Sequence, residues 1–240
     1  MRLSSDQPLT VGNTAKLYCL RLIDEAASRC TGEFRILDLG CGDGRNFVRL
    51  LQRRSNIRYI GVDQAQAAVE RARAALPSAQ ILHARAEDVR VDPVDAVVSF
   101  SALTYAVDRR GYVEAARSNL HGDGAVYLNY DAGRASMAGL ADQAKERSSR
   151  AFARLGLDWR YRAFIRDHDF DALVTAAGFR VDDDKRFNCG LKQLYPLLSG
   201  EARDRFMDEW LAFELSLNEL DVVGAETSSI LRTRNVVLTL

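Results

Sequence analysis

An acidic residue and three glycines stand close together early in the chain. Asp38 precedes Gly40, Gly42 and Gly44, and the segment reads as a buried strand, a loop and the start of a helix. Glycine has no Cβ and adopts positive φ, so such a loop lets the backbone come close to a ligand. A carboxylate at this position repels a phosphate and attracts a cation. We therefore expect the loop to bind a ligand that carries positive charge.

Other glycine motifs fit this loop less well. The dinucleotide fingerprint G-x-G-x-x-G needs its third glycine one residue later than Gly44, and a Walker loop needs a Lys-Ser/Thr pair that does not follow Gly44. A glycine turn without a ligand is the remaining alternative. The pattern Asp-x-Gly-x-Gly-x-Gly resembles motif I of the class I S-adenosylmethionine (SAM) methyltransferases, and SAM carries an ammonium and a sulfonium. The resemblance implies SAM contacts from Asp38, Gly40, Cys41, Gly42 and Asn46.

A second acidic residue follows the next apolar segment. Residues 57–63 read as a strand that ends at Asp63, 19 residues after Gly44. A carboxylate at the end of the second strand can bind both hydroxyls of a ribose, and Asp is also a good helix N-cap. The two roles can coexist. We expect Asp63 to bind an adenosine ribose, with Gln64 beside it.

The resemblance extends to two further strand ends. Residues 84–89, Ala-Arg-Ala-Glu-Asp-Val, match a family loop that holds the adenine. Arg85 replaces the usual acid there, so the backbone at Ala86 or the Glu87 carboxylate would make this contact. A solvated acidic loop is the alternative for Glu87. Residues 95–100 resemble motif IV, which implies that Ser99 and Phe100 lie close to the methyl group that is transferred.

Five apolar segments alternate with helical patterns between residues 31 and 130. This alternation predicts an α/β fold with a parallel, doubly wound, Rossmann-like sheet, which binds ligands outside the carboxyl ends of its strands. Two later segments, 179–187 and 235–240, are similar to the final strands of the family, in which the last strand runs antiparallel between the fifth and the sixth. The resemblance implies a seven-stranded sheet with helical cap insertions in a single domain, 1–240.

Three segments lie outside the common core. Residues 9–30 predict a helix with one apolar face, and the resemblance implies that this N-terminal helix covers SAM and that Tyr18 touches the SAM carboxylate. A half-buried Tyr at the edge of the core is the alternative. Residues 131–168 and 191–222 are expected to form cap or lid insertions, whose aromatic residues either line an acceptor pocket or form the core of a helical cap.

The expected reaction is in-line transfer of the methyl group to N or O of a small organic acceptor. The donor is already activated, so the protein mainly holds donor and acceptor in line. The segment after the fourth strand lacks the Asn/Asp-Pro-Pro-Tyr/Phe motif and looks like the small-molecule branch of the family. Tyr105 and Tyr130 are candidates for positioning the acceptor, and His168 and Asp131 for a general base. A solvated loop histidine is the alternative for His168.

The amino-acid composition limits the classes of partner that the protein is expected to bind. The 33 basic and 33 acidic residues balance, which argues against a nucleic-acid surface. No apolar segment approaches the length of a membrane span, and the four cysteines are dispersed without a CxxC pair. We therefore expect a cytoplasmic protein without a metal site. Two alternatives stay open: a methyltransferase that acts on a protein or tRNA, and a SAM-binding protein that does not transfer methyl. The oligomeric state does not follow from the sequence.

Overall fold

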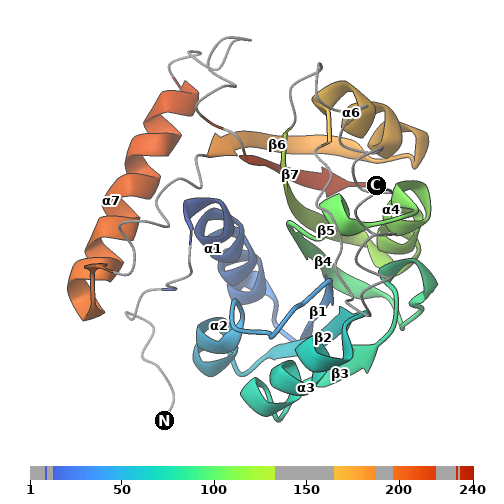
Figure 1. The fold of residues 1–240 in the computed structure, drawn as a ribbon, viewed down its shortest axis with the longest axis horizontal. Helices are drawn as coiled ribbons and strands as arrows, with labels where there is room; N and C mark the ends of the chain where they lie inside the picture. Colours follow the sequence, from blue (N-terminus) through green and yellow to red (C-terminus); the bar gives the residue numbers. More distant parts are fainter. Residues whose placement is uncertain (1–8, 10–12, 133–164, 188–196, 220–230, 232) are drawn as a thin grey trace, which may run out of the picture.

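A computed structural model describes Leu9, Asn13 and the ranges 14–132, 165–187, 197–219, 231 and 233–240 (Figure 1). The strands are β1 (Phe34–Leu39), β2 (Ile57–Asp63), β3 (Gln80–His83), β4 (Val94–Phe100), β5 (Leu120–Asp131), β6 (Arg180–Phe187) and β7 (Thr233–Thr239). The helices are α1 (Thr14–Arg29), α2 (Val48–Arg53), α3 (Gln66–Ala75), α4 (Arg109–Ser118), α6 (Asp167–Ala176) and α7 (Gly200–Glu219), with the short 3-10 helices η1 (Ala86–Asp88) and η2 (Leu103–Tyr105).

The seven strands form one sheet with the order β3-β2-β1-β4-β5-β7-β6. Strands β1 to β5 pair in parallel with their neighbours. Strand β7 is antiparallel to both β5 and β6. The expected doubly wound α/β sheet is therefore confirmed, including the last strand between the fifth and the sixth. This order brings the carboxyl ends of β1, β2 and β4 together at one edge of the sheet.

Helices cover both faces of the sheet (Figure 1). Helices α1, α2 and α3 share one buried cluster, to which Leu20, Leu50 and Val69 contribute. Helices α4 and α6 share the other cluster through Val113 and Phe170. Helix α7 packs outside α1, and its buried Glu214 accepts a hydrogen bond from Thr14 of α1.

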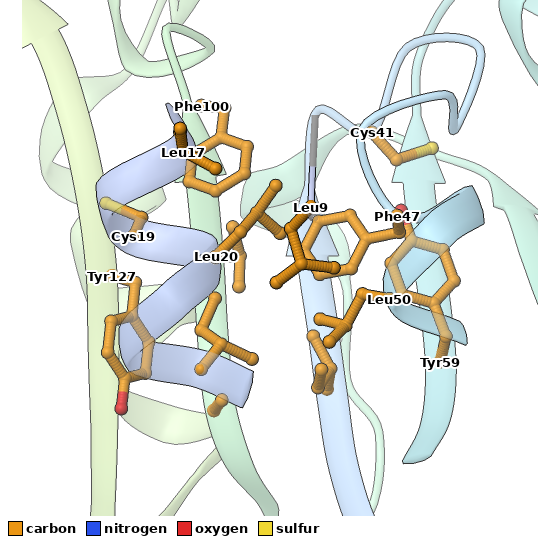
Figure 2. Close-up of a cluster of buried hydrophobic side chains, with 14 of the residues drawn as sticks. Leu9, Leu17, Cys19, Leu20, Cys41, Phe47, Leu50, Tyr59, Phe100 and Tyr127 are labelled. Atoms are coloured by element: carbon orange, nitrogen blue, oxygen red, sulfur yellow. The ribbon is translucent and has the colours of Figure 1, made fainter. Parts of the chain in front are cut away.

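The core under α1 reaches the glycine loop (Figure 2). The ring of Phe47 lies 4.8 Å from Tyr59 and 5.9 Å from Phe100, measured between ring centroids. Leu17 and Leu20 of α1 belong to the same buried cluster, with Leu17 beside Phe100. Aromatic pairs at such distances stabilise beyond the area they bury. The cluster therefore fixes the ends of β1, β2 and β4 relative to one another.

The segments predicted to lie outside the core are described in part. Helix α1 fills most of 9–30, and Asn13 caps it by accepting the Lys16 N–H at 2.9 Å. Residues 133–164, the bulk of the first expected insertion, lie outside the described residues. The ends of that insertion meet, because Ala132 and Ile165 form a β-bridge. Helix α7 occupies much of 191–222.

Helix α6 begins at Asp167, so His168 lies in its first turn and not in a loop before the helix. In the part of the chain that the structure describes, no helix is long and apolar enough to cross a membrane.

Candidate active site

A cavity of about 610 Å³ opens at the carboxyl ends of β1, β2, β3 and β4. Its volume lies within the roughly 300–1,000 Å³ typical of small-molecule sites. Eight residues singled out in the sequence line it: Gly40, Gly42, Asp63, Gln64, Ala86, Glu87, Phe100 and Tyr105. The cavity therefore gathers residues from four separate strand ends, as expected for a ligand site in a doubly wound sheet.

Only glycine fits the first turn of the motif I loop. Gly40 has φ +80°, and a Cβ there would lie 2.3 Å from the Cβ of Ala102 in the loop after β4. Gly42 also has positive φ, +59°. The N–H groups of Gly40 and Cys41 donate to the carbonyl of Val62 at 2.8 and 2.9 Å. The loop is thus fixed on β2 and pressed against the loop after β4, with its backbone facing the cavity.

Asp63 joins the motif I loop to the start of α3. Its Oδ2 accepts the N–H of Gly42 and its Oδ1 accepts the N–H of Ala65, both at 2.9 Å. An ionised carboxylate offers about four lone-pair sites, so each oxygen keeps a position for one further donor. Asp63 also lines the cavity. The geometry therefore allows the anchoring of the loop and the predicted contact with two ribose hydroxyls to coexist.

Asp38 lies behind Gly40 and is 2 % exposed. The Tyr59 hydroxyl donates to its Oδ2 at 2.6 Å, whereas Oδ1 has no hydrogen-bond partner among the described residues. Burial raises the pKa of Asp38 to about 7, against the opposing effects of the Tyr59 hydrogen bond and the charge of Lys16. A buried acceptor without a partner is costly. A cationic group next to Oδ1 would remove that cost, so this residue fits a ligand with an ammonium, as SAM has.

In the cavity wall, the Arg85 guanidinium hydrogen-bonds to the Glu87 carboxylate. Arg85 Nη2 donates to Glu87 Oε1 at 3.2 Å. The side chain of Glu87 is largely buried, so the simple solvated loop weighed from the sequence does not describe it. The residue that departs from the family pattern thus orients the neighbouring carboxylate. Contact between Glu87 and an adenine amino group stays a prediction.

Several predicted cofactor residues, Asp38 among them, lie outside the cavity lining. The Tyr18 hydroxyl donates to Asp183 Oδ2 at 2.6 Å, and its ring packs 5.3 Å from that of Phe187. Ser99 is buried against α4, where its hydroxyl and that of Tyr112 lie 2.8 Å apart. Cys41 is buried and Asn46 precedes α2, and neither lines the cavity. Tyr18 matches the alternative of an aromatic at the edge of the core.

Of the four catalytic candidates, Tyr105 alone lines the cavity, where it stands partly exposed at the rim. Tyr130 is fully buried on the α6 side of the sheet. Its hydroxyl donates to Asp167 at 2.9 Å and accepts from Arg234 at 3.1 Å, and burial raises its pKa. This pairing occupies the group that was expected to position an acceptor.

The two candidates for a general base are also away from the cavity lining. The side chain of His168 is 93 % exposed, and its Nδ1 lies 3.6 Å from Asp169. Asp131 Oδ1 accepts a hydrogen bond from Thr233 at 3.2 Å. A solvated histidine, the alternative weighed for His168, describes this position.

The cavity also includes residues that the sequence did not indicate. Arg71, Ser101, Ala102 and Tyr112 all contribute to its wall. Ser101 alone among the described non-glycine residues has positive φ, 60°. Such strain is set by the tertiary structure and often marks a functional site. Nothing in the residue type or spacing of Ser101 signals it in the sequence.

Comparisons with known proteins agree with this geometry. Residues 36–124 match a family model described as a methyltransferase domain. A TehB-like SAM-dependent methyltransferase from Corynebacterium glutamicum superposes with TM-score 0.55 and 17 % identity, covering 92 % of this chain and 86 % of its own. The plantazolicin methyltransferase BamL, solved with a triazolic desmethylPZN analog and S-adenosylhomocysteine (SAH), gives TM-score 0.59 and 16 % identity, covering 95 % and 84 %.

The same fold also occurs in an enzyme named for a different reaction. The cyclopropane synthase MmaA2 from Mycobacterium tuberculosis gives TM-score 0.58 and 15 % identity, covering 92 % of this chain and 84 % of its own. At these identities the likenesses concern the fold. No curated protein matches the chain by sequence. Residues 36–124 thus carry a methyltransferase domain, and the strand order and the motif I loop with its buried acid have the arrangement expected of a class I SAM-dependent methyltransferase.

Proposed function

We propose that the protein transfers the SAM methyl group to N or O of a small organic acceptor. The observation that carries the proposal is the cavity itself, whose size suits small ligands. Polar groups for a nucleoside, Asp63 and Glu87, lie on its β2 and β3 side. On the β4 side the wall is mainly apolar, with Phe100, Ala102 and Val107. That division leaves a wall suited to an organic acceptor beside the cofactor residues.

The chain's own residues would act mainly by holding the two ligands. SAM, when bound, supplies a methyl group already activated on a sulfonium. Asp38 would neutralise the ammonium, and Asp63 would accept from the ribose hydroxyls. The motif I loop, whose Gly40 and Gly42 line the cavity, would exclude water by lying with its backbone against the ligand. Correct alignment of two bound reactants can supply a large share of a rate acceleration, so a base is needed only for an acceptor that arrives protonated.

The cavity wall favours an acceptor with a free lone pair. In the described part of the chain, no histidine lines the cavity. The two carboxylates that line it are assigned to the nucleoside: Asp63, which also accepts two backbone N–H groups, and Glu87, which accepts from Arg85. A neutral amine or an already ionised hydroxyl needs no proton removed before attack. These acceptor types are the ones we propose to test first.

The test has two stages. Calorimetric titration with SAM, SAH and NAD is expected to show binding of SAM and SAH and not of NAD. The protein is then incubated with SAM labelled on its methyl group and with panels of small amines and phenols, and both SAH release and labelled product are measured by mass spectrometry. Labelled amine or phenol product supports the proposal. SAH binding without any labelled product would favour a SAM-binding protein without methyl transfer, and label on added tRNA or protein alone would favour a macromolecular acceptor.

A further inference from the structure

Two asparagines face each other at the end of the sheet beside the cavity. Asn129 of β5 and Asn235 of β7 are direct partners in the antiparallel ladder. Directly opposed residues point to the same face of a sheet, and the Asn235 side chain reaches the carbonyl of Ala15 in α1. Both asparagines therefore lie under α1. They are 1 % and 2 % exposed, respectively.

Each amide uses only one of its two ends. Asn129 Oδ1 accepts from the Ser101 hydroxyl at 3.1 Å. Asn235 Nδ2 donates to the Ala15 carbonyl at 2.6 Å and to Cys19 Sγ at 3.4 Å. The other ends, Asn129 Nδ2 and Asn235 Oδ1, are buried without a partner among the described residues. Buried polar atoms are nearly always hydrogen-bonded, so each of these two atoms is an open position for a further polar partner.

A third buried asparagine shows how this chain satisfies an amide that serves structure alone. Asn119 Nδ2 donates to the carbonyls of Val89 and Ala115 at 3.0 and 2.7 Å. Its Oδ1 accepts the N–H of Val91 at 2.7 Å. Both ends are occupied by the backbone. The open ends at β5 and β7 are therefore not a general property of asparagine in this core.

The amide pair lies one hydrogen bond behind the cavity wall. Ser101, which lines the cavity, donates to Asn129 through both its hydroxyl and its N–H, the latter to the Asn129 carbonyl at 3.1 Å. Phe100, also in the wall, is the ladder partner of Asn129 in β4. In the sheet, β5 and β7 lie on the far side of β4 from β2, which carries Asp63. The pair thus adjoins the acceptor side of the site and not the nucleoside side.

We propose that the Asn129–Asn235 amide pair binds a neutral polar group of the acceptor, a hydroxyl or a carboxamide. Such a group accepts from Asn129 Nδ2 and donates to Asn235 Oδ1. A carboxylate only accepts and an ammonium only donates, so either would leave one amide end open and place an unpaired charge in the core. The bound group orients the acceptor and is not itself methylated. This inference rests on the proposed function of the cavity.

The experiment uses full-length protein labelled with ¹⁵N-asparagine and saturated with SAH, whose binding is first measured by calorimetry. Four probes share one ring and differ in their polar group: benzyl alcohol, benzamide, benzoate and benzylamine. The side-chain amide signals are followed by NMR and assigned from Asn129→Asp and Asn235→Asp spectra. Benzyl alcohol and benzamide are expected to shift the signals of Asn129 and Asn235 in a saturable way, while the fully bonded Asn119 stays unmoved.

A variant then separates recognition from general perturbation. Asn129→Asp keeps an oxygen for Ser101 and loses the open donor, so benzamide affinity should fall roughly 2- to 13-fold. The matched control is Asn56→Asp, because Asn56 Nδ2 donates to the Ala27 carbonyl at the opposite end of the sheet; this variant should keep the wild-type affinity. The proposal is overturned if neither neutral probe shifts the pair, or if benzoate or benzylamine shifts it as strongly. Failure of SAH to bind would instead overturn the proposed function.

Discussion

Asp38→Asn should stabilise the ligand-free protein and weaken its binding of SAH and SAM. The amide has nearly the shape of the carboxylate, and its oxygen still accepts from the Tyr59 hydroxyl, which lies 2.6 Å from Asp38 Oδ2. The substitution removes a charge that is 2 % exposed and has one oxygen without a partner among the described residues. Folding no longer has to desolvate that charge, but the ligand's ammonium loses its counterion.

The pKa shift of Asp38 determines how much the unfolding free energy should differ between the wild type and Asp38→Asn. Burial raises the pKa of Asp38 from 3.8 to about 7, and each unit corresponds to about 1.4 kcal/mol. The folded protein therefore holds this proton more tightly than the unfolded chain does. The unfolding free energy is therefore undiminished by Asp38 below pH ~4. It decreases as the pH rises, and the decrease reaches its full value of about 4 kcal/mol above pH ~7. The variant has no such loss, so its advantage is about 4 kcal/mol at pH 8 and about 1.5 kcal/mol at pH 5.

Urea unfolding of ligand-free protein at pH 5 and pH 8 measures this difference directly. Asp92→Asn is the control, because the Asp92 side chain is 87 % exposed, and its unfolding free energy should match the wild type at both values. Calorimetry at pH 8 should show SAH affinity lowered roughly 10- to 150-fold in Asp38→Asn, as expected for a lost charge-assisted hydrogen bond. A variant that is less stable than the wild type at pH 8, or whose advantage does not grow with pH, would refute the reasoning.

Three further substitutions test the site and its support. Gly40→Ala should lower the unfolding free energy by about 2–5 kcal/mol and abolish SAH binding, because the new Cβ would lie 2.3 Å from that of Ala102. Adding Ala102→Gly should recover part of the stability in urea titration. If the double variant recovers none, this contact is not the cause of the loss. Asp63→Asn should weaken SAH binding roughly 10- to 150-fold by calorimetry, since one oxygen that accepts a loop N–H becomes a donor, and an unchanged affinity would contradict the assignment. Arg234→Met should lower the unfolding free energy by about 3–5 kcal/mol, because it leaves Asp184 without the guanidinium that now lies 2.6 Å away. An unchanged free energy in urea unfolding would show that the ion pairs of Arg234 make no net contribution to stability.

Local sequence signals determined most of the sheet and the cofactor side of the site. Runs of apolar residues mark strands that are buried on both faces, and the acids and glycines that follow the first two runs mark the edge where the cavity opens. Gly40 could be read because its turn needs positive φ and tolerates no Cβ. Asp63 could be read because its strand ends there. Both stand in local patterns that the sequence displays, although the contacts that explain them, Gly40 with Ala102 and Asp63 with Gly42, are formed only in the folded chain.

The acceptor side depended on contacts that no local pattern encodes. Asn129 and Tyr130 are adjacent, and alternation along a strand predicts opposite faces for them, but only the packed sheet shows that Asn129 lies under α1 while Tyr130 bonds to Arg234 and Asp167. The pairing of Asn129 with Asn235 requires the register of β7, which is fixed by long-range strand pairing. The positive φ of Ser101 likewise comes from the packing of its loop. The sequence thus indicated the sheet edge at which the cavity opens, and the tertiary structure decided which buried polar groups have partners and which do not, because burial and register belong to the whole fold.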